Sequence, residues 1–175
     1  EGTRLVSSAH GTLKRVAWVR GPPQSHCDAS SARGGPWSRG GTILFSASTV
    51  SPILRIASTG GSPVPVTTVP AGVNEGHRYP SFLPDGRHFL FNVGTTRADA
   101  AGVYVGSLDG GEPVRLLPDV TNALYATRPG GRGLLVFRRD RTLTAQRFDP
   151  DALETEGDMF PVAEGVTFGN AALNT

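Results

Sequence analysis

Short apolar runs separated by turn residues follow one another along the whole chain. Four of them are almost continuously hydrophobic, and each comes directly after a glycine-containing turn: residues 5–6, 43–45, 89–91 and 134–137. A short continuous run bounded by turn residues is typical of a strand that is covered on both faces. The pattern therefore predicts an all-β chain built from many short strands.

The turns in front of these runs repeat at a nearly constant spacing. They occupy residues 1–3, 40–42, 85–87 and 130–132. Their central glycines stand at positions 2, 41, 86 and 131, so the successive spacings are 39, 45 and 45 residues. A period of about 40–45 residues, with four short strands in each unit, is typical of β-propeller blades.

Three further strands complete each predicted blade. With the strands named A to D from the central axis outward, the apolar run is strand B. Strand C is predicted at 13–16, 53–56, 103–105 and 143–148. Strand D follows a glycine–proline turn, at 24–27, 64–67, 114–117 and 161–163, and a short strand A lies at 34–37, 79–82 and 124–127. Pro65 would interrupt a central strand, which fits the outer position of strand D.

We therefore predict a β-propeller made of four-stranded antiparallel blades, about four of them in a single region 1–175. The approximate blades are 1–28, 33–68, 78–117 and 122–163, with the start of a further blade at 164–175. We expect a fragment of a larger propeller; a closed ring of four blades is the alternative. An open arc predicts poor solubility in isolation, because its end blades expose apolar faces. A closed ring predicts a monomer that melts cooperatively.

Composition narrows the class of protein but not its activity. The chain has 175 residues, 38% of them hydrophobic, with a mean hydropathy of −0.17, as in soluble globular proteins. The formal net charge is +2, and the 17 basic residues, of which only Lys14 is lysine, are scattered. This argues against a nucleic-acid partner. The densest basic group, residues 138–141, is predicted to be a hairpin turn.

The sequence contains no segment that we expect to insert into a membrane. No apolar run approaches the roughly 18 residues that a membrane helix needs. The chain begins with Glu1, so targeting information is expected on a segment outside it. The single cysteine, Cys27, excludes an internal disulfide and a multi-cysteine metal site, and we expect it to be a small buried hydrophobe.

No set of residues has the pattern of a catalytic site. Residues 139–143 resemble part of a kinase catalytic loop but lack the downstream asparagine, and residues 131–133 are too short for a phosphate-binding loop. The Gly-x-Ser-x-Gly elbow of α/β-hydrolases is absent from the sequence. We expect a non-enzymatic segment with no catalytic residue and no cofactor.

Metal-ligand spacing is also missing. The four histidines, His10, His26, His77 and His88, fall on different strands and loops, and we expect structural roles for them. Glu75 and His77 are predicted on the loop before a strand A, where one pair cannot hold an ion, so no metal site is assigned. The acidic stretch 149–158 is predicted to connect strands C and D. Weak calcium binding there is the alternative.

Three segments carry a resemblance to a known family: residues 37–45, 79–91 and 102–109. They resemble TolB-like, WD-type propeller repeats, and more specifically the propellers attached to bacterial receptor-type serine/threonine kinases. The resemblance covers essentially the whole chain. Two repeats depart from the Pro-Asp-Gly turn of the family, at 39–41 and 129–131. We expect those two blades to be looser, because their turns lack the cap that the aspartate provides.

The resemblance implies an extracytoplasmic or periplasmic sensor that recognises a protein or peptide, with a kinase domain on an earlier part of the polypeptide. Two alternatives remain: the substrate-gating propeller of a prolyl-oligopeptidase-like peptidase, and a periplasmic TolB-like interaction module. In each case binding is expected on loops held by the rigid scaffold. The candidate loops are residues 93–101 and 72–78; the sequence does not predict the oligomeric state.

Overall fold

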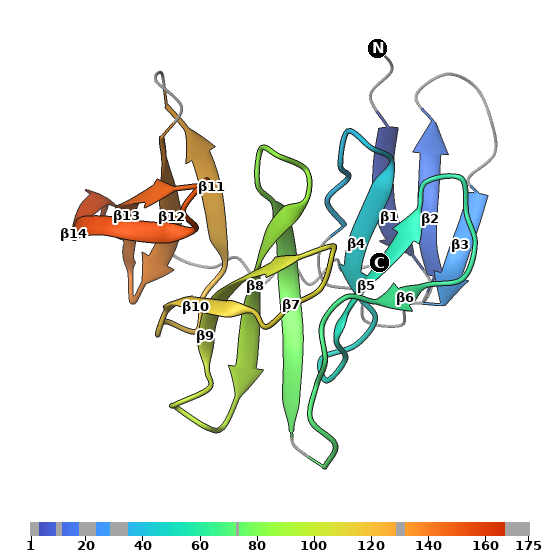
Figure 1. Cartoon of the computed structure of the whole chain (residues 1–175), viewed down its shortest axis with the longest axis horizontal. Coiled ribbons are helices and arrows are strands. Elements are labelled where there is room, and N and C mark those ends of the chain that lie inside the picture. Colours follow the sequence, from blue (N-terminus) through green and yellow to red (C-terminus); the bar gives the residue numbers. More distant parts are fainter. Residues whose placement is uncertain are drawn as a thin grey trace. The chain divides into compact units, whose positions relative to one another are not determined.

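A computed structural model describes residues 4–9, 12–17, 24–28, 35–72, 74–128 and 132–166, the first three ranges as backbone strands only. This part of the chain contains no helix (Figure 1). No segment in it is a helix long and apolar enough to cross a membrane. The chain divides into two compact units, Glu1–Ala123 and Leu124–Thr175.

The strands form four antiparallel sheets, and in each sheet neighbours in sequence are neighbours in space. The first sheet contains β1 (Arg4–Ala9), β2 (Thr12–Ala17) and β3 (Gln24–Asp28). The second contains β4 (Thr42–Ser46), β5 (Ile53–Ala57) and β6 (Val64–Pro65). The third contains β7 (Glu75–Phe82), β8 (His88–Thr95), β9 (Gly102–Ser107) and β10 (Val114–Leu117). The fourth contains β11 (Ala123–Thr127), β12 (Gly133–Arg139), β13 (Thr142–Asp149) and β14 (Glu154–Ala163).

These meanders are propeller blades, and we number them blades 1 to 4. The predicted all-β propeller is confirmed, but its strands are less regular than the sequence suggests. In blade 2 the described part of predicted strand A is a single bridge between Trp37 and Ile43, because Pro36 has no N–H to continue the ladder.

In blade 4 strand D is β14, which begins at Glu154 and so includes residues 154–158 of the predicted acidic connector. The predicted acidic connector is thereby shortened to residues 150–153.

The B strands of blades 2 and 3, β4 and β8, are buried on both faces, as their continuous hydrophobicity predicts. In β12 of blade 4, Leu134 and Val136 are only half-buried. In β4, Ile43 and Phe45 pack with Ile56 of β5 on one face. Leu44 points to the other face, where it joins a cluster with Phe89 of blade 3; Ile53, Phe91 and Val93 complete that cluster. Blades 2 and 3 therefore share one hydrophobic core within the first unit.

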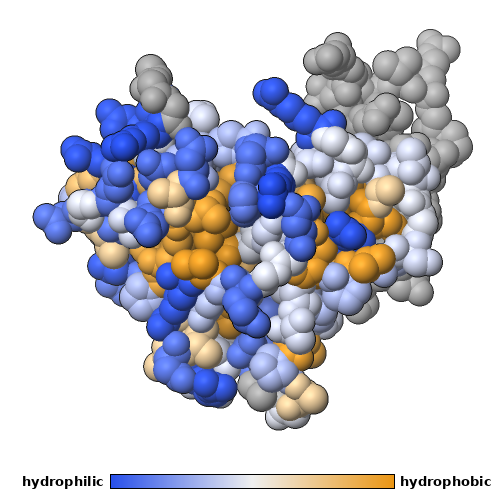
Figure 2. Space-filling model, in the orientation of Figure 1, coloured by the Kyte–Doolittle hydropathy of each residue, from blue (hydrophilic) through white to orange (hydrophobic). Residues whose placement is uncertain are grey.

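Blade 4 keeps several large hydrophobic side chains on its surface. Leu124, Phe160 and Val162 are exposed there. Figure 2 shows the hydrophobic side chains of one face of the molecule gathered in patches among hydrophilic ones. The expected poor solubility of the isolated chain remains a prediction.

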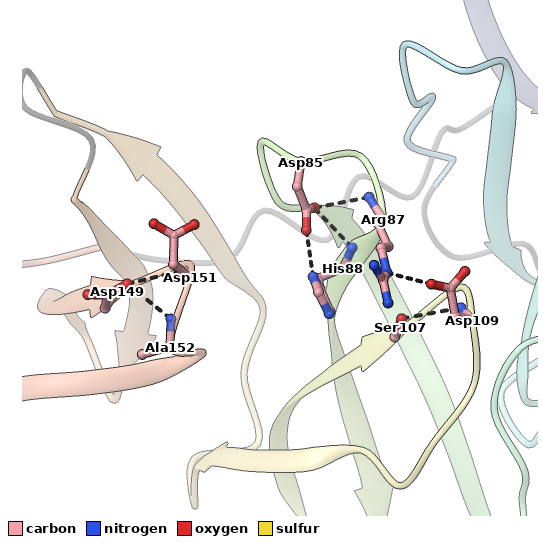
Figure 3. Close-up of polar contacts among 8 residues, drawn as sticks. All are labelled: Asp85, Arg87, His88, Ser107, Asp109, Asp149, Asp151 and Ala152. Carbon is pink, nitrogen blue, oxygen red and sulfur yellow. Dashed lines mark hydrogen bonds and ion pairs between the residues drawn. The ribbon is translucent and has the colours of Figure 1, made fainter.

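The turns between strands A and B are capped in two different ways. In blade 3, Asp85 Oδ1 accepts hydrogen bonds from the backbone N–H groups of Arg87 and His88, both at 3.0 Å (Figure 3). In blade 2, which has no aspartate at this turn, the hydroxyl of Ser38 accepts from the N–H of Thr42 at 3.1 Å. Ser38 therefore supplies a capping acceptor where the aspartate is missing. The expected looser structure of this blade stays a prediction. The corresponding turn of blade 4 lies outside the described residues.

Candidate functional site

The loops of blades 2 and 3 that follow strands B and D lie at one end of those blades. Strands alternate in direction in a meander, so the B–C and D–A connections must emerge together. We call this the loop end, formed by residues 47–52, 66–72, 74 and 96–101; it is at the bottom of Figure 1. The A–B and C–D turns, residues 83–87 and 108–113, lie at the opposite end, the turn end.

Both candidate loops are shorter than predicted. The predicted loop 72–78 is strand from Glu75 onward, because Glu75, Gly76 and His77 pair with β8. The predicted loop 93–101 is strand as far as Thr95. Glu75 and His77 are thus two positions apart on one strand, and their side chains share a face of the sheet.

A buried polar cluster joins these two side chains to Thr67. The Thr67 hydroxyl oxygen accepts the Ile53 N–H at 2.9 Å and lies 2.7 Å from His77 Nδ1. His77 Nε2 lies 3.4 Å from Glu75 Oε1. Since an ionised carboxylate can only accept, the pattern assigns the imidazole proton to Nε2, facing Glu75, and leaves Nδ1 to accept the Thr67 hydroxyl proton.

The imidazole of His77 is held in its neutral form. Burial lowers its pKa from the ordinary value of 6.5, and this outweighs the hydrogen bond and the charge of Glu75, which act in the opposite direction. The ring also packs on Phe91, with centroids 5.0 Å apart. A neutral ring that donates at one nitrogen and accepts at the other satisfies the buried hydroxyl and the carboxylate together.

The loop 96–101 is anchored by a side chain from the outer strand. The guanidinium of Arg115, on β10, donates to the carbonyl oxygens of Ala98, Asp99 and Ala101. The Tyr104 hydroxyl donates to the Ala100 carbonyl at 2.8 Å. These bonds satisfy successive carbonyls of the loop and give it one defined conformation.

The neighbouring loop, 47–52, is fixed against β7. Arg78 donates to the Thr49 carbonyl from Nε at 3.2 Å and from Nη2 at 2.7 Å. The N–H of His77 donates to the Ser51 carbonyl at 3.0 Å. A β-carbon on Gly76 would lie 1.9 Å from the Thr49 oxygen, so this approach requires glycine.

Two adjoining hollows open beside this cluster. The larger is a groove of about 500 Å³ between the outer segment 65–68 of blade 2 and residues 108–113 of blade 3. The smaller, which we call the Glu75 cavity, has a volume of about 180 Å³ and is lined by Glu75, His77, Phe91 and Tyr104 among others. Thr68, Glu112 and Pro113 line both hollows.

The cluster has the order of groups found in a carboxylate–histidine–hydroxyl relay, since Glu75, His77 and Thr67 are joined in that order. Thr67 is buried, and its oxygen already accepts the Ile53 N–H. Thr67 lines the adjoining groove, although it does not line the Glu75 cavity. The arrangement also offers a fixed carboxylate, an aromatic surface and ordered loops, which are groups that recognition sites use.

Other sequence-selected residues have structural partners. His88 Nδ1 lies 2.5 Å from Asp85 Oδ2 at the turn end. Partial burial raises the pKa of Asp85, but hydrogen bonds from the Arg87 N–H and from His88 outweigh it and leave the pKa lowered. The predicted basic hairpin turn is confirmed, with Asp140 and Arg141 between β12 and β13.

The acidic stretch of blade 4 is partly occupied by its own backbone. Asp149 Oδ1 accepts from the N–H groups of Asp151 and Ala152, and these bonds, the Ala152 bond most of all, lower the pKa of Asp149 (Figure 3). Within the described residues no three His, Cys, Asp or Glu side chains gather as metal ligands would. Calcium binding remains an untested alternative. His10 and the side chains of His26 and Cys27 fall outside the described part.

The sequence drew attention to Glu75 and His77 but missed Thr67, Tyr104 and Arg115. A strand extended to residue 75 would have placed Glu75 and His77 on one face through its period of two. No sequence pattern points to Thr67 or Arg115. The packing of blade 2 against blade 3 brings Thr67 to the site, and the pairing of β10 with β9 brings Arg115 there. Only the three-dimensional arrangement identifies them.

The fold is similar to several solved structures, although no protein-family model and no curated protein sequence matches the chain. TolB from Acinetobacter baumannii superposes with a TM-score of 0.60 at 20% identity, covering 83% of this chain and 36% of that one. An oligogalacturonate lyase in complex with manganese gives 0.60 at 15% identity, covering 87% and 42%. A structure from a study of two prolyl endopeptidases gives 0.57 at 14% identity, covering 94% and 30%.

Each similarity covers most of this chain but less than half of the other protein. At these identities it establishes the fold and not the activity. The chain therefore has the fold of part of a TolB-like β-propeller.

Proposed function

We propose that this chain is a non-catalytic recognition module that binds a protein or peptide at the loop end of blades 2 and 3. The observation that carries the proposal is that the loops of this end are held in place. Arg115 donates to carbonyls of loop 96–101, and Arg78 donates to a carbonyl of loop 47–52. The buried cluster of Glu75, His77 and Thr67 joins β7 to the segment that follows β6. Ordered loops beside the Glu75 cavity lose little conformational entropy on binding. The adjoining groove leads from this cavity to residues 108–113 of the turn end. Resemblance to TolB supports a protein partner.

The finer proposal is that the module is the extracytoplasmic sensor of a bacterial receptor-type serine/threonine kinase. It rests on the sequence resemblance of residues 79–91 and 102–109 to such propellers. The gating propeller of a prolyl-oligopeptidase-like enzyme is the second candidate, supported by the similarity to prolyl endopeptidases. The coding sequence around this segment separates them: kinase motifs and an apolar span upstream support the first, and a Gly-x-Ser-x-Gly elbow downstream supports the second.

Binding at the loop end can be tested with displayed peptides. Peptides selected on the 175-residue chain are then measured against Arg115→Ala, which removes the anchor of loop 96–101. We expect affinity to fall by about tenfold or more, because the loop must be ordered at the moment of binding. Arg147→Ala, at an exposed arginine of β13, is the matched control and should bind as the wild type does.

Two results would contradict the proposal. A selection that yields no binder would argue against a peptide-recognition surface. Binders that are equally weakened by Arg147→Ala and Arg115→Ala would show that the loop end is not the site.

A further inference from the structure

The Glu75 cavity has the size of a site for one side chain. Its volume of about 180 Å³ equals about six water molecules at roughly 30 Å³ each. Sites for whole small-molecule ligands are larger, about 300–1,000 Å³. The adjoining groove of about 500 Å³ is large enough for an extended segment of a partner, from which a side chain could enter the cavity.

The ionisable groups that line the cavity are acidic or neutral. They are Glu75, Glu112, Tyr104 and the neutral His77, and no arginine or lysine lines it, although the chain has 17 basic residues. Because His77 gives its Nε2 proton to Glu75 and accepts the Thr67 hydroxyl at Nδ1, it contributes no positive charge. Glu75 therefore lines the cavity without a cationic partner among the other lining residues.

Three arginines of the surrounding elements have their own hydrogen-bond partners, although the charge of Glu75 also acts on Arg97. A fourth, Arg55, lines the adjoining groove and donates to the Leu108 carbonyl. Arg97, on the loop 96–101, pairs with Asp99, with Nη2 and Oδ2 2.8 Å apart. Arg115 donates to the carbonyls of that loop, and Arg78 donates to the Thr49 carbonyl. None of the three lines the cavity.

Aromatic rings form another wall of the cavity. The centroids of Phe91 and Tyr104 are 5.8 Å apart, with the ring planes tilted by 30°. A cation within about 6 Å of an aromatic face is attracted by the ring quadrupole. A carboxylate beside aromatic faces favours a cation with an alkyl stem over an anion or a purely apolar group.

We propose that the Glu75 cavity is a subsite for a single primary ammonium group, supplied by a lysine side chain of the bound protein. The four-carbon stem and compact ammonium of lysine match the cavity volume and the aromatic wall. Glu75 receives the ammonium, and Phe91 and Tyr104 contact the stem. This inference rests on the proposed function, since the groove carries the rest of the partner.

Titration with small probes, followed by NMR of the 175-residue chain, tests the subsite without a known partner. The probe is Nα-acetyl-lysine methylamide, and its Nε-acetylated form is the uncharged control. We expect shifts at Glu75, His77 and Tyr104 with the charged probe and at least about tenfold weaker binding of the acetylated one. Glycine methylamide tests whether an N-terminal amine also enters.

Two substitutions test whether the carboxylate of Glu75 receives the ammonium group of the probe. Glu75→Gln keeps the shape and the acceptor for His77 but removes the charge, and should weaken the lysine probe by about tenfold or more. Glu154→Gln, an exposed carboxylate of β14, is the matched control and should leave binding unchanged. Should Glu75→Gln fail to fold, Tyr104→Leu, which removes an aromatic face, is expected to weaken the probe about threefold.

The outcomes separate this inference from the proposed function. Equal binding of the charged and acetylated probes would overturn the ammonium subsite. Unchanged binding to Glu75→Gln would overturn Glu75 as the group that receives the ammonium, because Glu112 also lines the cavity. Binding of glycine methylamide alone would overturn lysine as the source. If the binding of selected peptides depends on Arg115 and yet tolerates replacement of every lysine, that result would contradict the subsite and support the proposed function. Failure to select any peptide would contradict the proposed function alone.

Discussion

Blade 3 carries a histidine–carboxylate pair at each end, and the two pairs differ in nearly every physical property. At the turn end, His88 and Asp85 lie 2.5 Å apart, with side chains 23% and 43% exposed. At the loop end, His77 and Glu75 lie 3.4 Å apart, with side chains only 5% and 9% exposed. The same two chemical groups thus serve a solvated turn in one place and a buried cluster in the other.

Burial accounts for the difference. Asp85 is used by its own turn, since it accepts two backbone N–H groups as well as His88. Glu75 accepts from His77 and also lines a cavity, so it has capacity for a ligand. A carboxylate occupied by its own backbone stabilises the fold, whereas a buried carboxylate beside open space is a candidate for recognition.

The largest expected effect comes from disrupting the loop end at Gly76. Gly76→Ala places a β-carbon 1.9 Å from the Thr49 carbonyl oxygen, so loop 47–52 or β7 must shift. We expect a loss of about 3 kcal/mol in the free energy of unfolding, measured by urea titration. Gly40→Ala, whose β-carbon would meet only the Ser38 hydroxyl at 3.7 Å, is the control. Equal losses in both variants would show that the close approach is not what requires glycine.

Removal of the turn-end carboxylate should have a smaller effect. Asp85→Ala leaves the N–H groups of Arg87 and His88 without their acceptor, and we expect a loss of about 1–2 kcal/mol in chemical denaturation. Ser38→Ala removes one such acceptor in blade 2 and should cost about 1 kcal/mol. A greater loss from Ser38→Ala would mean that its burial matters more than the number of hydrogen bonds.

The two pairs should respond to acid in different ranges of pH. His77 has a lowered pKa in the folded chain, so unfolding takes up a proton as the pH falls below the ordinary value of 6.5. Its contribution is therefore fully present above about pH 6.5 and is lost as the pH falls toward the folded pKa. Asp85, also lowered, contributes above its ordinary value of 3.8 and loses that contribution only in stronger acid.

Melting temperatures at about pH 7.5 and 5.5 test this difference. We expect the wild type and His88→Gln to lose stability between these values and His77→Gln to lose less. The same pH dependence in all three proteins would exclude His77 as the titrating group.

The smallest effect is expected from the surface ion pair next to the turn-end histidine. Arg87 and Asp109 lie 2.6 Å apart, but their side chains are 59% and 61% exposed. Arg87→Ala should change the free energy of unfolding by no more than about 0.5 kcal/mol, because solvent screens such pairs and the Asp85 cap uses the backbone of Arg87. A loss as large as that of Asp85→Ala would show that the pair, and not the cap, holds the turn.

The sequence by itself determined the propeller. Glycine turns at a period near 45 residues and B strands hydrophobic on both faces specify blades, because a strand with no polar face must be covered on both sides. It also located the outer strands through their prolines. These are local properties, which depend on neighbouring residues and therefore appear in the sequence.

The tertiary structure alone decided the candidate site. Thr67 follows β6 of blade 2, Glu75 and His77 lie on β7, and Arg115 lies on β10; their meeting depends on how strands and blades pack. Whether a carboxylate is exposed like Asp85 or buried like Glu75 is likewise set by what packs over it. Burial is a property of the assembled fold, and it is burial that distinguishes the turn cap at Asp85 from the proposed site at Glu75.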